Sequence, residues 1–453
     1  MKKQFIAFST LLMLAAAMKL QSAEPENSLI SKSLSVQSAD EKFKLSFGGR
    51  IQADGAVFVG EDYQPLGNGV GFRRVRLGAT ATFGDHLSGK MEVDFTDGSF
   101  SLKDCFVKYD LPHSLSVKAG NFKESFAMSA MTSSGDLMFM EKANVVSAFA
   151  PEYHMGVQGE WRSGSFMTAA GVYFRRINGS KEKDYSETNN KAGQDEGISY
   201  TARAVWMPLS QDKTRGFHLG GALSYRTPKT TVGSLMPNTV RYSTTSLSYI
   251  NKIKFLDTAP ITNVDNDLLA GLELAGFHRQ FRMQGEYILN HTHRSGDLST
   301  EKFNGFYIQA GYLLFGGQQK YSTSRGAFTQ PTPGKSWGDL ELAARFDRID
   351  LNGTQVKGGS ANGLTLGLNY YATRNLKLQL NYSYVDNDKY ADAFNSAAVG
   401  YNSSGEKVYD GEKVDENSGK GGNAYGILEL RMQLTIKAMT HSKEMIYGAR
   451  DRT

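Results

Sequence analysis

Polar and apolar side chains alternate along this chain from residue 43 almost to its end. In residues 43–58, Phe47 and Ile51 occupy apolar positions, and Arg50 and Gln52 occupy polar positions between them. Successive side chains on a β-strand point to opposite faces, so this segment predicts a strand with one apolar and one polar face. The polar face of this predicted strand includes an arginine.

The next alternating segment, residues 72–83, repeats the pattern with Arg74 and Arg76 at polar positions. In a soluble sheet the apolar face would form the core. In a barrel that spans a membrane, the apolar face meets lipid and the arginines point into the lumen. Arg73 has the apolar parity and is therefore expected at the rim or at a contact between protomers.

Comparable segments recur along the whole chain, and together they predict about sixteen strands, many of the 9–11 residues that a tilted strand needs to cross a bilayer. Short turns at one rim and long polar connections at the other are typical of such a barrel. The further segments lie near residues 90–95, 104–111, 115–119, 154–162, 166–175, 198–206, 217–226, 267–275, 280–290, 303–314, 338–348, 363–371, 375–385 and 426–436. The sequence therefore predicts an all-β protein, a transmembrane antiparallel up-and-down β-barrel over residues 42–436.

The two ends of the chain differ from this barrel region. Lys2 and Lys3 precede an apolar run that extends to Met18, and small residues follow at Ser22 and Ala23. This arrangement predicts a cleaved signal peptide over residues 1–23 and hence export. Residues 24–41 are expected to form an N-terminal extension, and residues 437–453 a polar C-terminal tail.

Composition agrees with a barrel that has a polar interior. The mean hydropathy is −0.40, and after the leader no apolar run approaches the roughly 18 residues of a transmembrane helix. The chain contains 48 glycines, 22 tyrosines and 26 phenylalanines, which suits many strands, tight turns and aromatic girdles. Its one cysteine, Cys105, excludes an intramolecular disulfide.

Charge and motifs restrict the classes of function. The net charge is only +5 and no basic patch accompanies a nucleic-acid-binding motif, so no nucleic-acid partner is expected. His291 and His293 would share one face of a strand, but no third ligand is apparent and no metal or other cofactor is predicted. No hydrolase or nucleotide-binding motif is present, which argues against an enzyme.

Six stretches resemble the phosphate-selective porin O and P family in order and spacing. They are residues 49–54, 72–78, 91–95 with 102–104, 117–126, 139–142 and 337–346. The resemblance implies a sixteen-stranded barrel in the outer membrane, in contact with its lipid and assembled as a homotrimer. It also implies a passive channel for phosphate or similar small anions, narrowed by a loop that folds inward.

The resemblance also assigns roles to particular residues. Arg50, Arg74 and Arg76 would be lumen-facing arginines that line the pore. Lys123 would be a lysine of the constriction. Asp104 would be an acidic counterweight, unless it only forms a salt bridge with Lys103 or an arginine. Residues 127–150 would form the constricting loop.

Other arginines share the polar parity of their strands, and the sequence leaves two roles open for each of them. Each either lines the pore, as Arg203 is expected to do, or pairs with a carboxylate across the lumen. These residues are Arg203, Arg226, Arg282, Arg345 and Arg431. The function expected from the whole pattern is an anion-selective porin. The alternatives are a general diffusion porin, a channel for another solute, and a surface-exposed structural or adhesion barrel.

Overall fold

The computed structural model describes residues 34–60, 63–174, 176–177, 195–229, 238–245, 247–419 and 421–437. The predicted signal peptide and almost all of the predicted C-terminal tail lie outside these residues. None of the helices in the described ranges is long and apolar enough to cross a membrane.

Sixteen antiparallel strands of the described chain form one closed barrel, which confirms the predicted fold class. Each strand coincides with one of the alternating segments. They are β2 (Phe43–Val59), β3 (Gly69–Phe83), β4 (Leu87–Asp94), β5 (Ser101–Asp110), β6 (Leu115–Lys123), β7 (Tyr153–Ser163), β8 (Phe166–Tyr173), β9 (Ile198–Trp206), β10 (Arg215–Thr227), β13 (Val264–His278), β14 (Phe281–Arg294), β15 (Glu301–Leu313), β18 (Asp339–Asn352), β19 (Lys357–Tyr371), β20 (Leu376–Asn387) and β23 (Ala424–Lys437).

The barrel closes where the first and last of these strands pair. β2 and β23 are antiparallel from Gly48 opposite Lys437 to Val59 opposite Gly426. Closure leaves no unpaired strand edge, which a chain in hydrocarbon requires. A short strand, β1 (Ser35–Gln37), lies in the predicted N-terminal extension and pairs with β2.

The apolar face of the strands is the outer surface of the barrel. Leu77 and Leu272 are 61% and 63% exposed, and Leu223 is 59% exposed. Polar side chains on the opposite parity, such as Gln52 and Thr365, are fully buried. The wall is therefore inverted relative to a soluble barrel, as a lipid environment demands.

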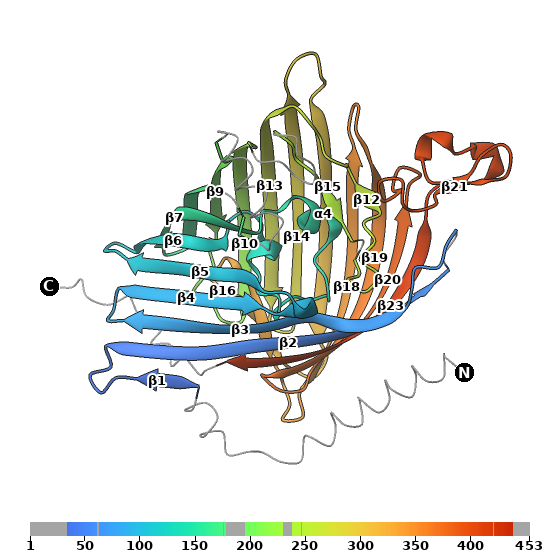
Figure 1. Cartoon of the computed structure of the whole chain (residues 1–453). Coiled ribbons are helices and arrows are strands. Elements are labelled where there is room, and N and C mark those ends of the chain that lie inside the picture. The colour runs from blue at the N-terminus through green and yellow to red at the C-terminus, as the bar shows by residue number, and fades with distance from the viewer. Residues whose placement is uncertain are drawn as a thin grey trace.

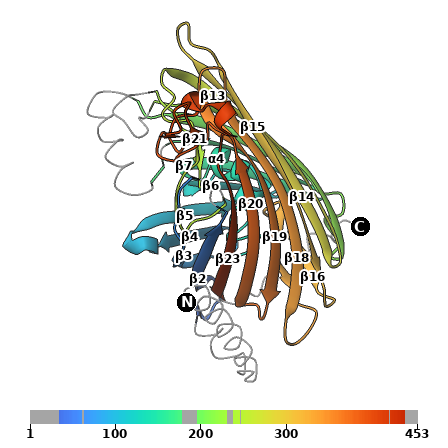
Figure 2. The same cartoon turned by 90° about the vertical axis from the view of Figure 1, so that its right-hand side faces the viewer.

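The strands differ in length around the barrel. β4 to β9 contain 8 to 11 residues each. The strands β13 to β15 and β18 to β20 contain 12 to 15 residues. Figure 2 shows these longer strands as a tall wall beside the lower one.

Long connections lie at one rim, and most of the connections at the other rim are short turns. The β20–β23 connection, which includes β21 (Gly400–Tyr401) and β22 (Lys407–Val408), forms a lobe at the long-loop rim (Figure 1). The exception at the short-turn rim is the β15–β18 connection, whose strands β16 (Gln318–Ser322) and β17 (Ala327–Thr332) pair with each other. We call residues 318–332 the lumen hairpin.

The lumen is filled on one side of the barrel. There, apolar side chains of β10 to β23 pack against two inserted segments, the β6–β7 connection and the hairpin of β11 (Ser243–Thr244) and β12 (Leu256–Asp257). The inserted segments contribute Phe126, Phe149, Tyr242 and Phe255 to this cluster, among others. We call this region the filled half. Part of the open space that remains lies against β2 to β8.

Candidate functional site: the lumen

The β6–β7 connection, residues 124–152, folds into the barrel and is called the constriction loop. It contains two short helices, α3 (Met128–Met131) and α4 (Asn144–Phe149), and most of its residues are buried. Figure 1 shows α4 within the ring of strands. The inward-folded loop expected over residues 127–150 is thus present.

Polar side chains of the barrel wall hold this loop by its backbone. Lys377 Nζ donates to the carbonyl of Leu137 at 2.7 Å, and Asn369 donates to the carbonyl of Met138 at 2.9 Å. Arg345 donates to the carbonyl of Glu141 at 2.8 Å. A buried loop must satisfy its backbone polar groups, and the polar parity of the strands supplies the donors.

Two cavities of the described chain meet at the lumen hairpin, one of about 440 Å³ lined by its strands and one of about 400 Å³ at its tip. The second is bounded by β2 to β8, the constriction loop and the hairpin tip, and we call it the basic passage. Eight basic side chains and three acidic ones line it. The basic residues are Arg50, Arg76, Lys90, Lys108, Lys118, Lys123, Arg162 and Arg325, and the acidic ones are Glu92, Asp104 and Glu160.

Arg50 reaches from β2 to the constriction loop. Its Nη1 donates to the hydroxyl of Ser134 at 2.6 Å and its Nη2 to the hydroxyl of Ser133 at 3.1 Å, whereas its buried Nε has no hydrogen-bond partner. Arg76 is its direct neighbour in the β2–β3 register. Two adjacent guanidinium groups repel each other, and Arg50 has no carboxylate partner within the described chain.

The acidic residues of the basic passage are each paired with a base. Arg76 contacts Glu92 at 3.1 Å and Asp94 at 2.8 Å. Asp104 accepts from Lys90 at 2.5 Å, so the base beside it is Lys90 and neither Lys103 nor an arginine. The remaining acid, Glu160, is paired with Lys118 and Arg162.

Lys123, at the end of β6, lines the basic passage with its charge uncompensated. Its Nζ donates to the carbonyl of Ala130 at 2.6 Å and lies 5.7 Å from the ring centre of Tyr153. No carboxylate of the described residues forms an ion pair with it. Lys123 and Arg50 are therefore the two basic side chains of the passage that form no ion pair within the described part of the chain.

Arg74 points inward but lies beside the passage and not on its surface. Its side chain is 4% exposed, its Nη1 donates to Gln52 at 2.8 Å, and its Nε has no partner. The constriction loop buries Arg74, because the loop lies against Gln52, whose side-chain amide donates to the carbonyl of Ser134 in that loop.

The expectation for Arg73 was wrong. A β-bulge between Gln52 and Ala53 in the β2–β3 ladder shifts the parity at this point. The Arg73 guanidinium consequently points into the barrel, with Nε and Nη2 bound to the two carboxylate oxygens of Glu141 at 2.6 and 2.9 Å. Burial opposes the ionisation of Glu141, but the charges of Arg73 and Arg74 outweigh it and lower its pKa.

Arg203 does not line the basic passage, contrary to the expectation from its parity. It is 2% exposed and forms a bidentate ion pair with Glu273 at 2.8 and 2.7 Å. It also donates to the carbonyls of Arg325 and Gly326 at 3.1 and 2.9 Å. The lumen hairpin buries Arg203, and the alternation of side chains along β9 does not reveal this burial.

The other arginines of the same class also have carboxylate partners. Arg282 binds Glu341 at 2.9 Å and Arg431 binds Asp54 at 2.6 Å, and all four side chains are buried. The two remaining pairs are Arg226 with Glu124 at 2.8 Å and Arg345 with Asp347 at 3.7 Å. All five arginines thus pair with carboxylates, but the partners lie on the same or nearby strands or on the constriction loop and not across the lumen.

Several residues of the passage were not singled out from the sequence. Lys90, Lys108 and Lys118 lie on polar parities of β4 to β6, and that parity was a usable signal. Arg325 lies at the tip of the lumen hairpin, 3.7 Å from Asp136 of the constriction loop. No periodic pattern indicates that this tip reaches the passage.

Residues 45–403 match the model of the phosphate-selective porin O and P family. The chain belongs to this family. It is accordingly a porin of the outer membrane, and the resemblance found in the sequence is confirmed.

Two curated relatives match most of this porin. An uncharacterised protein of Caulobacter vibrioides is 28% identical over 369 residues, which cover 77% of this chain and 69% of the relative. Porin O of Pseudomonas aeruginosa is 24% identical over 390 residues, 79% of this chain and 86% of the relative.

Solved structures share the fold of this porin at low identity. The trimer form of OmpT, an outer membrane protein of Vibrio cholerae, has a TM-score of 0.50 and 13% identity, with 87% of this chain and 99% of that chain covered. OprB of Pseudomonas putida has a TM-score of 0.50 and 10% identity, with 87% and 94% covered. These likenesses concern the fold alone.

Proposed function

We propose that this porin is a passive, anion-selective channel that conducts phosphate or similar small oxyanions through the basic passage. The observation that supports it best is the lining of that passage, in which eight basic side chains face three acidic ones. All three acids are already paired with bases. The local charge, and not the small net charge of the chain, therefore favours anions.

Oxyanion chemistry matches the donors that remain. A guanidinium group is always charged, weakly hydrated and shaped to bind oxyanions. The Arg50 Nε lacks an acceptor, and its other nitrogens donate only to the hydroxyls of Ser133 and Ser134. An anion would relieve the repulsion between Arg50 and Arg76.

Weak binding is as important as attraction, because a channel must also release its ion. The hydroxyls of Ser133 and Ser134 compete with an incoming anion for Arg50, and the carbonyl of Ala130 competes for Lys123. Asp104 offsets part of the charge of Lys90. We expect several shallow sites in series along the passage.

Planar-bilayer recording of the purified full-length protein tests this proposal. In a KCl gradient we expect a zero-current potential of the sign given by chloride movement, and added phosphate should reduce the chloride current. A cation-selective or non-selective potential would overturn anion selectivity. Current that phosphate leaves unchanged would overturn phosphate binding and favour a general diffusion porin, and absence of any conductance would favour the adhesion alternative.

We also propose a homotrimer and the removal of residues 1–23. The trimer form of OmpT from Vibrio cholerae supports the first point, and the basic and apolar segments before Ala23 support the second. Light scattering coupled to gel filtration should give three protomers. N-terminal sequencing of the mature protein should begin at Glu24, the first residue of the extension that precedes the barrel over residues 42–436.

A further inference from the structure

A second cavity lies on the other side of the lumen hairpin. It has a volume of about 440 Å³, within the range of ligand-binding pockets, and shares no lining residue with the basic passage among the described residues. Its walls are β10, β13, the 207–214 turn and the lumen hairpin. The hairpin thus separates two compartments at the short-turn rim.

Aromatic rings form one wall of this cavity. The rings of Phe277 and Tyr321 lie nearly parallel, at an interplanar angle of 17° and 6.3 Å between centroids, and Phe328 meets both edge-on. Phe277 lies over Gly216, where a Cβ atom would come within 2.2 Å of the ring. The absence of a side chain at Gly216 therefore makes room for this ring.

Buried hydrogen bonds hold Tyr321 in place. Its hydroxyl lies 2.5 Å from Nδ1 of His218, whose Nε2 lies 3.0 Å from Glu273. Glu273 in turn binds Arg203, which donates to two carbonyls of the hairpin. These hydrogen bonds fix the position of the Tyr321 ring, so the aromatic wall is preorganised for binding.

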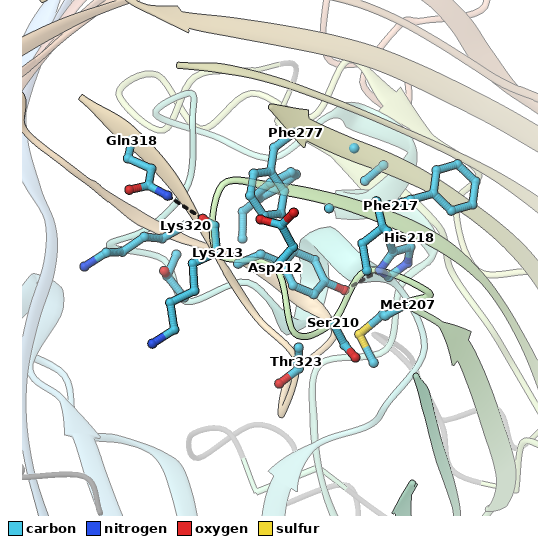
Figure 3. Close-up of a pocket in the computed structure, with 17 residues that line it drawn as sticks. Met207, Ser210, Asp212, Lys213, Phe217, His218, Phe277, Gln318, Lys320 and Thr323 are labelled. Atoms are coloured by element: carbon cyan, nitrogen blue, oxygen red, sulfur yellow. Dashed lines mark hydrogen bonds between the residues drawn. The ribbon is translucent and has the colours of Figure 1, made fainter. Parts of the chain in front are cut away.

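Positive charge is concentrated on one side of the cavity. Lys213 and Lys320 are exposed lining residues, and Figure 3 shows them extending to the same side, away from His218 and Met207. The one acidic lining residue, Asp212, is compensated by Arg215, whose Nε lies 2.8 Å from its carboxylate. A ligand that fills the site would combine a flat apolar body with one negative group.

We propose that this cavity binds small aromatic carboxylates, of which benzoate is the simplest, separately from the anion passage. The ring of the ligand packs against Tyr321 and Phe277, and the buried Phe328 supports both of these rings from behind. Its carboxylate accepts charge-assisted hydrogen bonds from Lys213 and Lys320. The site is independent of whether the basic passage conducts phosphate.

Calorimetric titration of benzoate into the full-length protein in lipid nanodiscs tests this site, with empty nanodiscs subtracted. We expect saturable binding that falls at least about tenfold in the K213A/K320A double variant. Benzamide and acetate, which lack the charge and the ring respectively, should bind at least about tenfold more weakly. Lys335→Ala, at an exposed lysine on the same rim outside the cavity, should leave benzoate binding unchanged.

Three outcomes would overturn the proposal. They are no binding of benzoate to the wild-type protein, equal binding by the double variant, and displacement of benzoate by inorganic phosphate that is unchanged in the double variant. Because phosphate also binds lysine ammonium groups, only displacement that does not depend on Lys213 and Lys320 would place benzoate in the basic passage. A failure here leaves conductance untouched, so it is distinguishable from a failure of the proposed anion channel.

Discussion

The basic passage and the filled half of this barrel share one strand pattern, but the inward-facing charges have different surroundings in each. In the basic passage, inward-facing charges of β2 to β7 border open space and bases outnumber acids. In the filled half, inward-facing arginines are buried against carboxylates and the inserted segments. The difference teaches that an arginine on the polar parity borders open space only where the inserted segments leave part of its side chain uncovered.

The largest effect should come from breaking a buried ion pair in the filled half. Arg282→Ala leaves the buried carboxylate of Glu341 without its cation, which costs about 3–5 kcal/mol. We expect a matching loss in the free energy of unfolding, measured by guanidinium titration in lipid vesicles. Arg348→Ala, at an exposed arginine of β18, should cost under about 1 kcal/mol. An unchanged midpoint for Arg282→Ala would show that the filled half does not stabilise the barrel.

The next effect concerns the basic passage. Arg50→Ala removes an uncompensated charge and its donors, which corresponds to about 1.5 kcal/mol and about tenfold weaker inhibition by phosphate. The zero-current potential in a KCl gradient should move toward zero. Arg50→Lys keeps the charge but loses the fork geometry, so its effect should be intermediate. Unchanged potentials and inhibition would remove Arg50 from the conduction path.

A smaller effect should follow from moving Arg50 without changing any charge. A Cβ atom at Gly135 would lie 2.7 Å from Arg50 Nε. Gly135→Ala should displace the guanidinium and weaken phosphate inhibition by about threefold while the protein remains folded. Gly159→Ala is the matched control, because its nearest neighbour would lie at 3.9 Å. Equal behaviour of the two variants would contradict the position assigned to Arg50.

The smallest effect should have the opposite sign. Asp104→Asn releases Lys90 from its closest partner, so the preference for anions should rise. The pair is partly exposed, at 33% and 17%, and is therefore worth only ~0.3 kcal/mol. Zero-current potentials should show a small shift away from zero. A shift toward zero would mean that Asp104 does not oppose anion entry.

The sequence predicted the wall well because the signal for a strand is local. All sixteen strands overlap the alternating segments, and Arg50 and Arg76 point into the lumen as their parity requires. The lysines at positions 90, 108 and 118 were equally visible on polar parities. Arg73 shows the limit of this signal, since one bulge reversed its face.

The constriction loop and the lumen hairpin, which cover parts of the lumen, were harder to predict. The constriction loop came from family resemblance, and nothing periodic indicated the lumen hairpin in the β15–β18 connection. Its tip buries Arg203 and brings Arg325 to the passage through contacts more than 120 residues apart in sequence. Such contacts depend on the closed barrel and leave no local pattern.

The sequence by itself determined the barrel, the lipid-facing surface and the direction of most side chains, because a period of two fixes both faces of a strand. Only the tertiary structure decided which inward-facing charges remain open to an ion. The reason is physical: a buried arginine needs a carboxylate or carbonyl partner, and the inserted segments determine which arginines are buried. Arg282 and Arg50 both occupy polar positions of their strands. Arg282 is buried in an ion pair with Glu341, whereas Arg50 borders the basic passage and is a candidate anion site.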